Sequence, residues 1–100
     1  HVFILNRNAG AAEDVVADIR KAGGRAEAVS ADITDRTLLE RAFDRIGRCD
    51  VLVNSAGTMS QAPFEQVSGE EFQRLLAVNL LGLFACCQLA TRGMPSGGRI

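Results

Sequence analysis

The stretch Asp50-Val51-Leu52-Val53-Asn54-Ser55-Ala56-Gly57 decides how this sequence is interpreted. Residues 51–53 are all apolar and predict a short strand buried on both faces, which is typical of a parallel sheet. The four small or polar residues that follow predict a turn at the carboxyl end of that strand. Taken alone, such a turn is ordinary, so its meaning depends on the sequence on either side.

Upstream of this stretch, strand-like and helix-like segments alternate. Residues 2–5 predict a buried strand, 11–22 a helix ended by the Gly23-Gly24 pair, and 25–30 a second strand. A second helix with one apolar face follows, capped by Thr34 or Asp35 and ended at Gly47. Alternation of this kind predicts an α/β fold, a doubly wound parallel sheet with right-handed crossovers and helices on both faces.

Downstream, residues 58–67 predict a loop, and Ser68-Gly69-Glu70-Glu71 is a capping box that opens a helix reaching about Arg92. The helix is apolar nearly all round from Leu75 onward, so we expect cover on more than one side. The apolar run 75–87 is too short to span a bilayer, which predicts a protein without a membrane span.

Composition excludes several classes of function. The net charge of −1 argues against a nucleic-acid binder and against a polybasic membrane-surface protein, and 47% hydrophobic residues argue against disorder. The three cysteines, Cys49, Cys86 and Cys87, have a spacing that favours neither a disulfide framework nor a metal site. A reducing, cytoplasmic setting is therefore expected.

Polar residues follow each of the three predicted strands. They are Asn6-Arg7, Asp32-Ile33 and the turn 54–57. Ligands of open α/β sheets bind at the carboxyl ends of the strands, so we expect these three strand ends to gather along one edge and form a binding site.

Three runs of sequence together resemble the short-chain dehydrogenase/reductase superfamily, in particular its 3-oxoacyl reductase-like members. They are Ala-Asp-Ile-Thr-Asp at 31–35, the stretch 50–57, and Val-Asn-Leu-Leu-Gly at 78–82. The family commonly has Asn-Asn-Ala-Gly where this chain has Asn-Ser-Ala-Gly, a change that keeps a small polar side chain. The resemblance implies that residues 1–100 are an internal part of one Rossmann domain, from its second strand to the start of its fifth.

The resemblance assigns residues to the adenosine half of a nicotinamide cofactor. It implies that Asp32 accepts a hydrogen bond from the adenine amino group and that the Ile33 backbone lies beside the ring. Asp32 could instead cap the next helix, but Thr34 and Asp35 are better placed for that, which leaves Asp32 for binding. The other residues implied on this side are Asn54 at the end of the central strand and the small Ala56 and Gly57, which let the backbone pass close to a ribose.

The first strand end bears on the choice between NADP and NAD. An acidic residue there would bind both ribose hydroxyls and repel a 2′-phosphate, whereas this chain has Asn6, which repels nothing. Arg7 can pair with the phosphate through two charge-assisted hydrogen bonds, which favours NADP. NAD stays open, because arginine also follows the acidic residue in many relatives that use NAD, and Arg7 can equally be a solvated surface charge.

Asn79 is unusual because it lies in the middle of an apolar helix. A buried amide requires hydrogen-bond partners, so we expect a polar group to reach it. The resemblance places Asn79 in an Asn-Ser-Tyr-Lys tetrad, where it holds a local break in the helix whose freed carbonyl binds a water in the proton relay. The alternative is a core asparagine with ordinary structural hydrogen bonds.

The resemblance implies an oxidoreductase that transfers hydride between a nicotinamide and an alcohol or ketone. The chain contains no tyrosine and has neither the Tyr-x-x-x-Lys pair nor the glycine-rich turn of the family. Two alternatives are a non-catalytic nucleotide-binding protein that acts as a sensor or scaffold, and a nucleotide-sugar epimerase, which the runs 54–57 and 78–82 disfavour. The family also implies a homo-oligomer, a dimer or tetramer, paired through the long helix.

Overall fold

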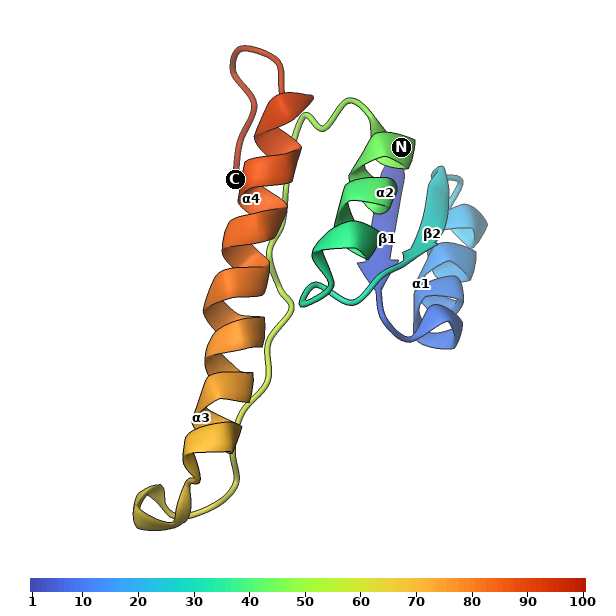
Figure 1. The fold of residues 1–100 in the computed structure, drawn as a ribbon. Coiled ribbons are helices and arrows are strands. Elements are labelled where there is room, and N and C mark those ends of the chain that lie inside the picture. The colour runs from blue at the N-terminus through green and yellow to red at the C-terminus, as the bar shows by residue number, and fades with distance from the viewer. The chain divides into compact units, whose positions relative to one another are not determined.

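The computed structural model describes all 100 residues, and the chain forms two compact units, His1–Gly47 and Arg48–Ile100. Each unit is described by itself. Figure 1 shows the elements of both along the chain.

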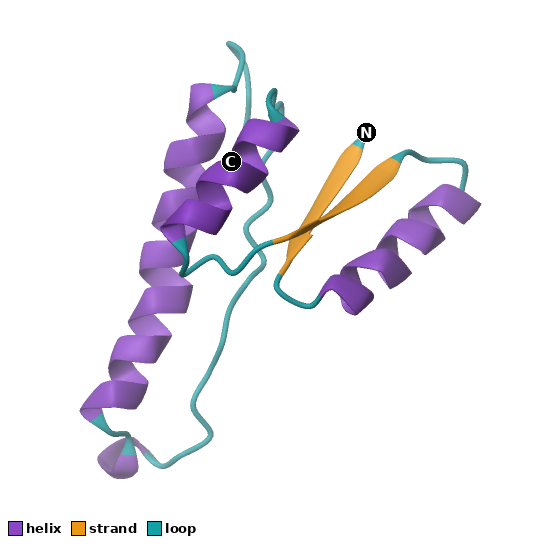
Figure 2. Cartoon of the chain, turned by 45° about the vertical axis from the view of Figure 1, so that its right-hand side comes forward, coloured by secondary structure: helices purple, strands orange, loops and turns teal.

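The first unit is a small α/β layer structure. Strands β1 (Val2–Asn6) and β2 (Ala26–Ser30) pair in parallel, in register from Val2 opposite Ala26 to Asn6 opposite Ser30. Helix α1 (Ala9–Lys21) covers one face of this sheet and α2 (Arg36–Ile46) the other, as Figures 1 and 2 both show. The expected parallel sheet with helices on both faces is therefore confirmed for this unit.

Local signals set the ends of both helices. The Asn8 side chain accepts a hydrogen bond from the Ala11 N–H and begins α1, and the Asp35 side chain does the same with Leu38 for α2. Gly23 and Gly47 follow the two helices with φ of 81° and 66°, a conformation that costs glycine little. Asp35 is therefore the cap of α2, one of the two candidates that the sequence offered.

The core of the chain lies mainly in the first unit. Eight of the eleven buried apolar residues belong to it, and Leu39 and Val16 are the largest side chains that are fully buried. These two come from α2 and α1, so each helix contributes a fully buried apolar side chain to the core.

The second unit is built around one long helix. An extended segment and a short 3₁₀ helix, η1 (Phe64–Gln66), precede it. The helix then runs as α3 (Gly69–Leu76), a π-helical turn η2 (Ala77–Gly82) and α4 (Leu83–Arg92) (Figure 1). Ser68 caps it by accepting a hydrogen bond from the Glu71 N–H at 3.1 Å, so the helix begins where the sequence predicts.

The expected buried strand at 51–53 is wrong for this chain. Val51 makes a single parallel bridge with Arg99, and the side chains of Val51 and Val53 are exposed. A strand buried on both faces requires hydrogen-bonded neighbours and covering helices, and within this chain the segment pairs at one residue only.

The expected cover of the long helix is also wrong for this chain. Five large apolar side chains along it are exposed: Phe72, Leu76, Leu80, Leu81 and Phe84.

The length of this helix also differs from the expectation. Gly69–Arg92 forms one continuous helix of 24 residues that is long and apolar enough to cross a membrane by length and composition alone. The apolar run 75–87 underestimates the length of this helix, because the polar first and last turns extend it. A core helix of a soluble protein meets the same criterion.

Candidate functional site

The first two strand ends carry the predicted cofactor residues to one edge of the sheet. Asn6 ends β1 opposite Ser30, and its carbonyl accepts a hydrogen bond from the Ala31 N–H at 3.3 Å. Arg7 and Asp32 follow at this edge, close enough for the charge of Arg7 to help lower the pKa of the Asp32 carboxyl. The sequence predicts this gathering correctly for the first two strand ends.

Asp32 is held by a residue two positions further along the chain. Its Oδ1 accepts hydrogen bonds from the Thr34 backbone N–H at 2.9 Å and from the Thr34 hydroxyl at 2.7 Å. These two bonds are the main cause of a lowered Asp32 pKa, and Arg7 adds to them. Capping by Thr34 or Asp35 was expected to leave Asp32 free. Asp35 does cap the helix, but Thr34 engages one oxygen of Asp32, so the expectation is wrong for that oxygen. The other oxygen, Oδ2, makes no hydrogen bond within the chain and stays available.

Asn6 and Arg7 differ in how firmly they are held. The Asn6 Oδ1 accepts a hydrogen bond from the Asn8 N–H at 2.9 Å, which fixes its side chain at the turn into α1. Arg7 is exposed and its guanidinium makes no hydrogen bond or ion pair within the chain. A cation in that state has its full set of donors available for an anionic group. Ile33, half-buried, occupies the turn beside Asp32.

The third strand end lies in the second unit. The Asn54 Nδ2 donates to the Cys87 Sγ at 3.4 Å, so a side chain of α4 holds this asparagine. Ala56 and Gly57 are exposed, and a Cβ built on Gly57 would stand 3.5 Å from the Asn79 Oδ1, which is ordinary contact. That this strand end joins the other two stays a prediction.

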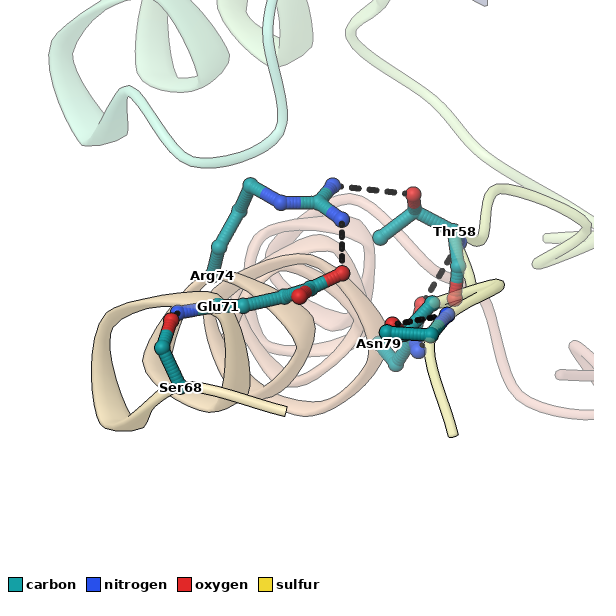
Figure 3. A network of polar contacts seen from close by, with 7 residues as sticks. Thr58, Ser68, Glu71, Arg74 and Asn79 are labelled. Carbon is teal, nitrogen blue, oxygen red and sulfur yellow. Dashed lines mark hydrogen bonds and ion pairs between the residues drawn. The ribbon is translucent and has the colours of Figure 1, made fainter. Parts of the chain in front are cut away.

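Asn79 binds the backbone of the segment that follows the Asn-Ser-Ala-Gly turn. Its Oδ1 accepts from the Thr58 N–H and its Nδ2 donates to the Thr58 carbonyl, both at 2.8 Å (Figure 3). Asn79 lies inside the π-helical turn η2, so the expected local break in the helix is present. The expected polar partner is Thr58. The expectation that Asn79 is buried is wrong for this chain, because its leucine neighbours Leu80 and Leu81 are themselves exposed.

This network includes residues that are not among the predicted site residues, namely Thr58, Glu71 and Arg74. The Arg74 Nη1 donates to the Thr58 hydroxyl at 3.0 Å, and the Arg74 Nη2 lies 3.9 Å from the Glu71 Oε1 (Figure 3). Thr58 is thus held at its N–H, its carbonyl and its hydroxyl. The available signal was that Thr58 directly follows the motif at 54–57. Its partners are 16 and 21 residues away, which no local pattern reveals.

The surroundings of Cys49 and Cys86 favour the protonated thiol, which is not the nucleophilic form. Burial raises the pKa of Cys86 and of Cys49, and in both cases it is the main cause. The chemistry that the site residues support is instead binding: an acceptor at Asp32, a free cation at Arg7, and a tightly held loop at Thr58.

Comparison with known proteins identifies the family. The family model described as short chain dehydrogenase matches residues 1–100. An uncharacterized oxidoreductase of Methylorubrum extorquens is 41% identical over 93 residues, which are 89% of this chain and 38% of that protein. The sorbitol dehydrogenase of Cereibacter sphaeroides is 35% identical over 102 residues, 98% of this chain and 39% of that enzyme.

A solved structure is similar over the same range. The short chain dehydrogenase from Burkholderia cenocepacia J2315, solved in complex with NADP, has a TM-score of 0.87 and 33% identity over 98% of this chain and 42% of its own. The chain thus spans about two-fifths of the length of these relatives and has an incomplete Rossmann-type α/β fold. By the match of its whole length to the family model, the chain belongs to the short-chain dehydrogenase family.

Proposed function

We propose that this chain is an internal part, residues 1–100, of the Rossmann domain of an NAD(P)-dependent oxidoreductase that interconverts an alcohol and a ketone. Family membership supports the reaction class, and the NADP in the Burkholderia cenocepacia structure supports the cofactor class. The observation that carries the proposal is the pair of 2.8 Å hydrogen bonds between Asn79 and the Thr58 backbone inside a π-helical turn. π-Helical turns are rare in proteins, and those that occur are often found at functional sites.

The residues at the strand ends fit the adenosine half of a nicotinamide cofactor. Asp32 keeps its Oδ2 without a hydrogen bond, and the two bonds to its Oδ1 favour the ionised form, which is an acceptor for an adenine amino group. Ile33 would lie beside the adenine ring. Asn54, Ala56 and Gly57 would border the adenosine ribose, where the exposed, small residues leave room for it.

Asn79 would act at the other end of the cofactor as the catalytic residue that this chain contributes. The nicotinamide, when bound, supplies or accepts a hydride. Asn79 binds the Thr58 backbone and so holds the π-helical turn to the loop at Thr58, and the backbone of that turn would then lie beside the reacting groups. A fixed backbone carbonyl there can hold a water for proton transfer, which is the role that the family resemblance implies.

Arg7 favours NADP over NAD in this proposal. Its guanidinium is exposed and unpaired, and Asn6 beside it carries no charge that would repel a 2′-phosphate. Replacing Arg7 by methionine in the longer protein is expected to weaken NADPH binding about 10-fold and NADH binding less than about 2-fold, as expected for a lost charge-assisted pair. Equal weakening for both cofactors, or a wild type that prefers NADH, would show that Arg7 does not bind the 2′-phosphate.

Further features of the longer protein are proposed on the same basis. The partner would be a small-molecule alcohol or ketone, with no nucleic-acid or membrane partner. The protein would be cytoplasmic and a homo-oligomer, a dimer or tetramer, in which the exposed apolar side of the long helix is covered.

The test is direct binding followed by turnover. The longer protein is titrated with NADPH and with NADH by calorimetry, and NADPH oxidation is then followed at increasing concentrations of simple ketones and ketoses. We expect saturable NADPH binding and ketone-dependent oxidation. Binding without turnover on any ketone would instead favour the non-catalytic sensor or scaffold, and absence of nucleotide binding would refute the proposal.

A further inference from the structure

Thr58 is a loop residue that the long helix holds at both its backbone and its side chain. Asn79 binds its N–H and its carbonyl at 2.8 Å, and Arg74 donates to its hydroxyl at 3.0 Å. Three of its polar atoms are therefore fixed by two side chains of the same long helix (Figure 3). The two bonds from Asn79 satisfy the one donor and the one acceptor of the Thr58 backbone, so the bond from Arg74 adds a contact that fixes the side chain as well.

The helix geometry explains how two residues five positions apart reach one target. On a regular α-helix, residues five apart point about 140° away from each other. The π-helical turn Ala77–Gly82 begins between Arg74 and Asn79, and its wider turns advance the chain through fewer degrees per residue. This brings Asn79 round toward the side of Arg74, whose long side chain covers the remaining distance to Thr58.

The Arg74 guanidinium is itself oriented from its other side. Its Nη2 lies 3.9 Å from the Glu71 Oε1, one turn back along α3, and Ser68 caps the same turn through the Glu71 N–H. The ion pair is partly exposed and contributes little to stability. The guanidinium thus has Nη2 on the side of Glu71 while its Nη1 donates to the Thr58 hydroxyl.

We propose that Arg74 is a positioning residue for the reaction, acting through the Thr58 side chain on the loop that Asn79 binds. The inference rests on the proposed function, because it needs a reaction for the loop to serve. Without Arg74, Thr58 keeps its two backbone bonds to Asn79 but its side chain is released, and the loop 56–58 gains freedom next to the π-helical turn.

The experiment is a double-variant comparison in the longer protein. Arg74→Met removes the donor, Thr58→Val removes the hydroxyl at nearly constant shape, and the third protein carries both changes. Each single variant is expected to lower kcat about 10-fold through the displaced loop, with NADPH affinity within about 3-fold of wild type. The double variant should lose no more than either single one, because both remove the same bond.

Matched variants separate positioning from general destabilisation. Arg74→Lys and Thr58→Ser keep a donor and a hydroxyl and should recover part of kcat, while Arg92→Met, an exposed arginine on the same helix, should leave kcat and the melting temperature unchanged. The inference is overturned if Arg74→Met matches Arg92→Met in kcat, or if the losses of the two single variants multiply in the double variant. A wild type that neither binds NADPH nor turns over refutes the proposed function first, and the inference with it.

Discussion

The two units hold their polar site residues in opposite ways. In the first unit Asp32 is fixed by Thr34, two residues away, above a core that contains fully buried Leu39 and Val16. In the second unit Asn79 is fixed by the loop residue Thr58, 21 residues away, and Asn54 by Cys87, 33 residues away. Asn79 and Cys87 lie on the long helix, whose large apolar side chains are mostly exposed. The first site is thus made by a local turn on an apolar core, and the second by long-range polar bonds.

This difference indicates where each unit is sensitive to substitution. A local turn survives small shifts of the surrounding structure, because both partners move together. A bond between residues far apart in sequence holds only while the loop and the helix keep their relative position. We therefore expect apolar substitutions to matter most in the first unit and polar substitutions in the second.

The largest expected effect is in the core of the first unit. Leu39→Ala removes a side chain that is 0% exposed and should lower the free energy of unfolding by about 2–5 kcal/mol. Leu38→Ala, next to it on α2 but 40% exposed, is the matched control and should cost less than half as much. Urea denaturation of the longer protein measures both. Equal costs would show that α2 does not bury Leu39 more deeply than Leu38.

A smaller effect is expected at the Asn54–Cys87 contact. Cys87→Ala removes the acceptor of the Asn54 Nδ2 and should cost about 1 kcal/mol, whereas Cys87→Ser keeps an acceptor and should cost less. At the adjacent Cys86, which is buried and makes no hydrogen bond, the order should reverse, since serine there buries an unpaired hydroxyl. If Cys87→Ser is as costly as Cys87→Ala, the contact is packing and not a hydrogen bond.

The smallest effect concerns the pKa of Asp32. The carboxyl titrates below the ordinary aspartate value of 3.8, so its ionised form stabilises the folded state above that pH, and the stabilisation is lost as the pH falls through the lowered pKa. Thr34→Val keeps the backbone N–H bond to Asp32 but removes the hydroxyl bond, and it should raise the Asp32 pKa more than Arg7→Met, because the hydroxyl bond outweighs the charge of Arg7. NMR titration of the Asp32 side-chain carboxyl carbon measures this. A larger rise with Arg7→Met would mean that the charge of Arg7, and not the hydrogen bond from the Thr34 hydroxyl, is the main determinant of the Asp32 pKa.

The same distinction explains what the sequence predicts and what it does not. Helix ends depend on residues within one turn, so the capping residues Ser68 and Asp35 and the glycines Gly23 and Gly47 could be identified in advance. Asn79 could be singled out because an amide is unusual in the middle of an apolar helix, although the burial expected for it is wrong. The identity of its hydrogen-bond partner was not visible, because Thr58 is brought to it by the fold.

Burial was the property that sequence predicted least well in the second unit. The apolar segment 51–53 and the long helix both have the composition of buried elements, yet Val53 and Leu81 are exposed. Composition indicates how much apolar surface a segment could bury. Whether that surface is buried depends on which other segments are present to cover it. In the first unit the two helices supply that cover, and the apolar pattern agrees with the observed core at Val16, Leu39 and Phe43. The expectation of a buried strand at 2–5 is wrong, because no residue of β1 is fully buried, and Val15 and Leu38 are exposed as well.

The most direct measurement of the central claim is turnover by the Asn79→Ala variant of the longer protein, with exposed Gln73→Ala on the same helix as control. If the bonds from Asn79 to Thr58 organise a nicotinamide site, kcat for NADPH-dependent ketone reduction should fall about 100-fold, while NADPH still binds within about 3-fold of the wild-type affinity. The control should match the wild type. An Asn79→Ala variant that turns over at the wild-type rate would contradict the account.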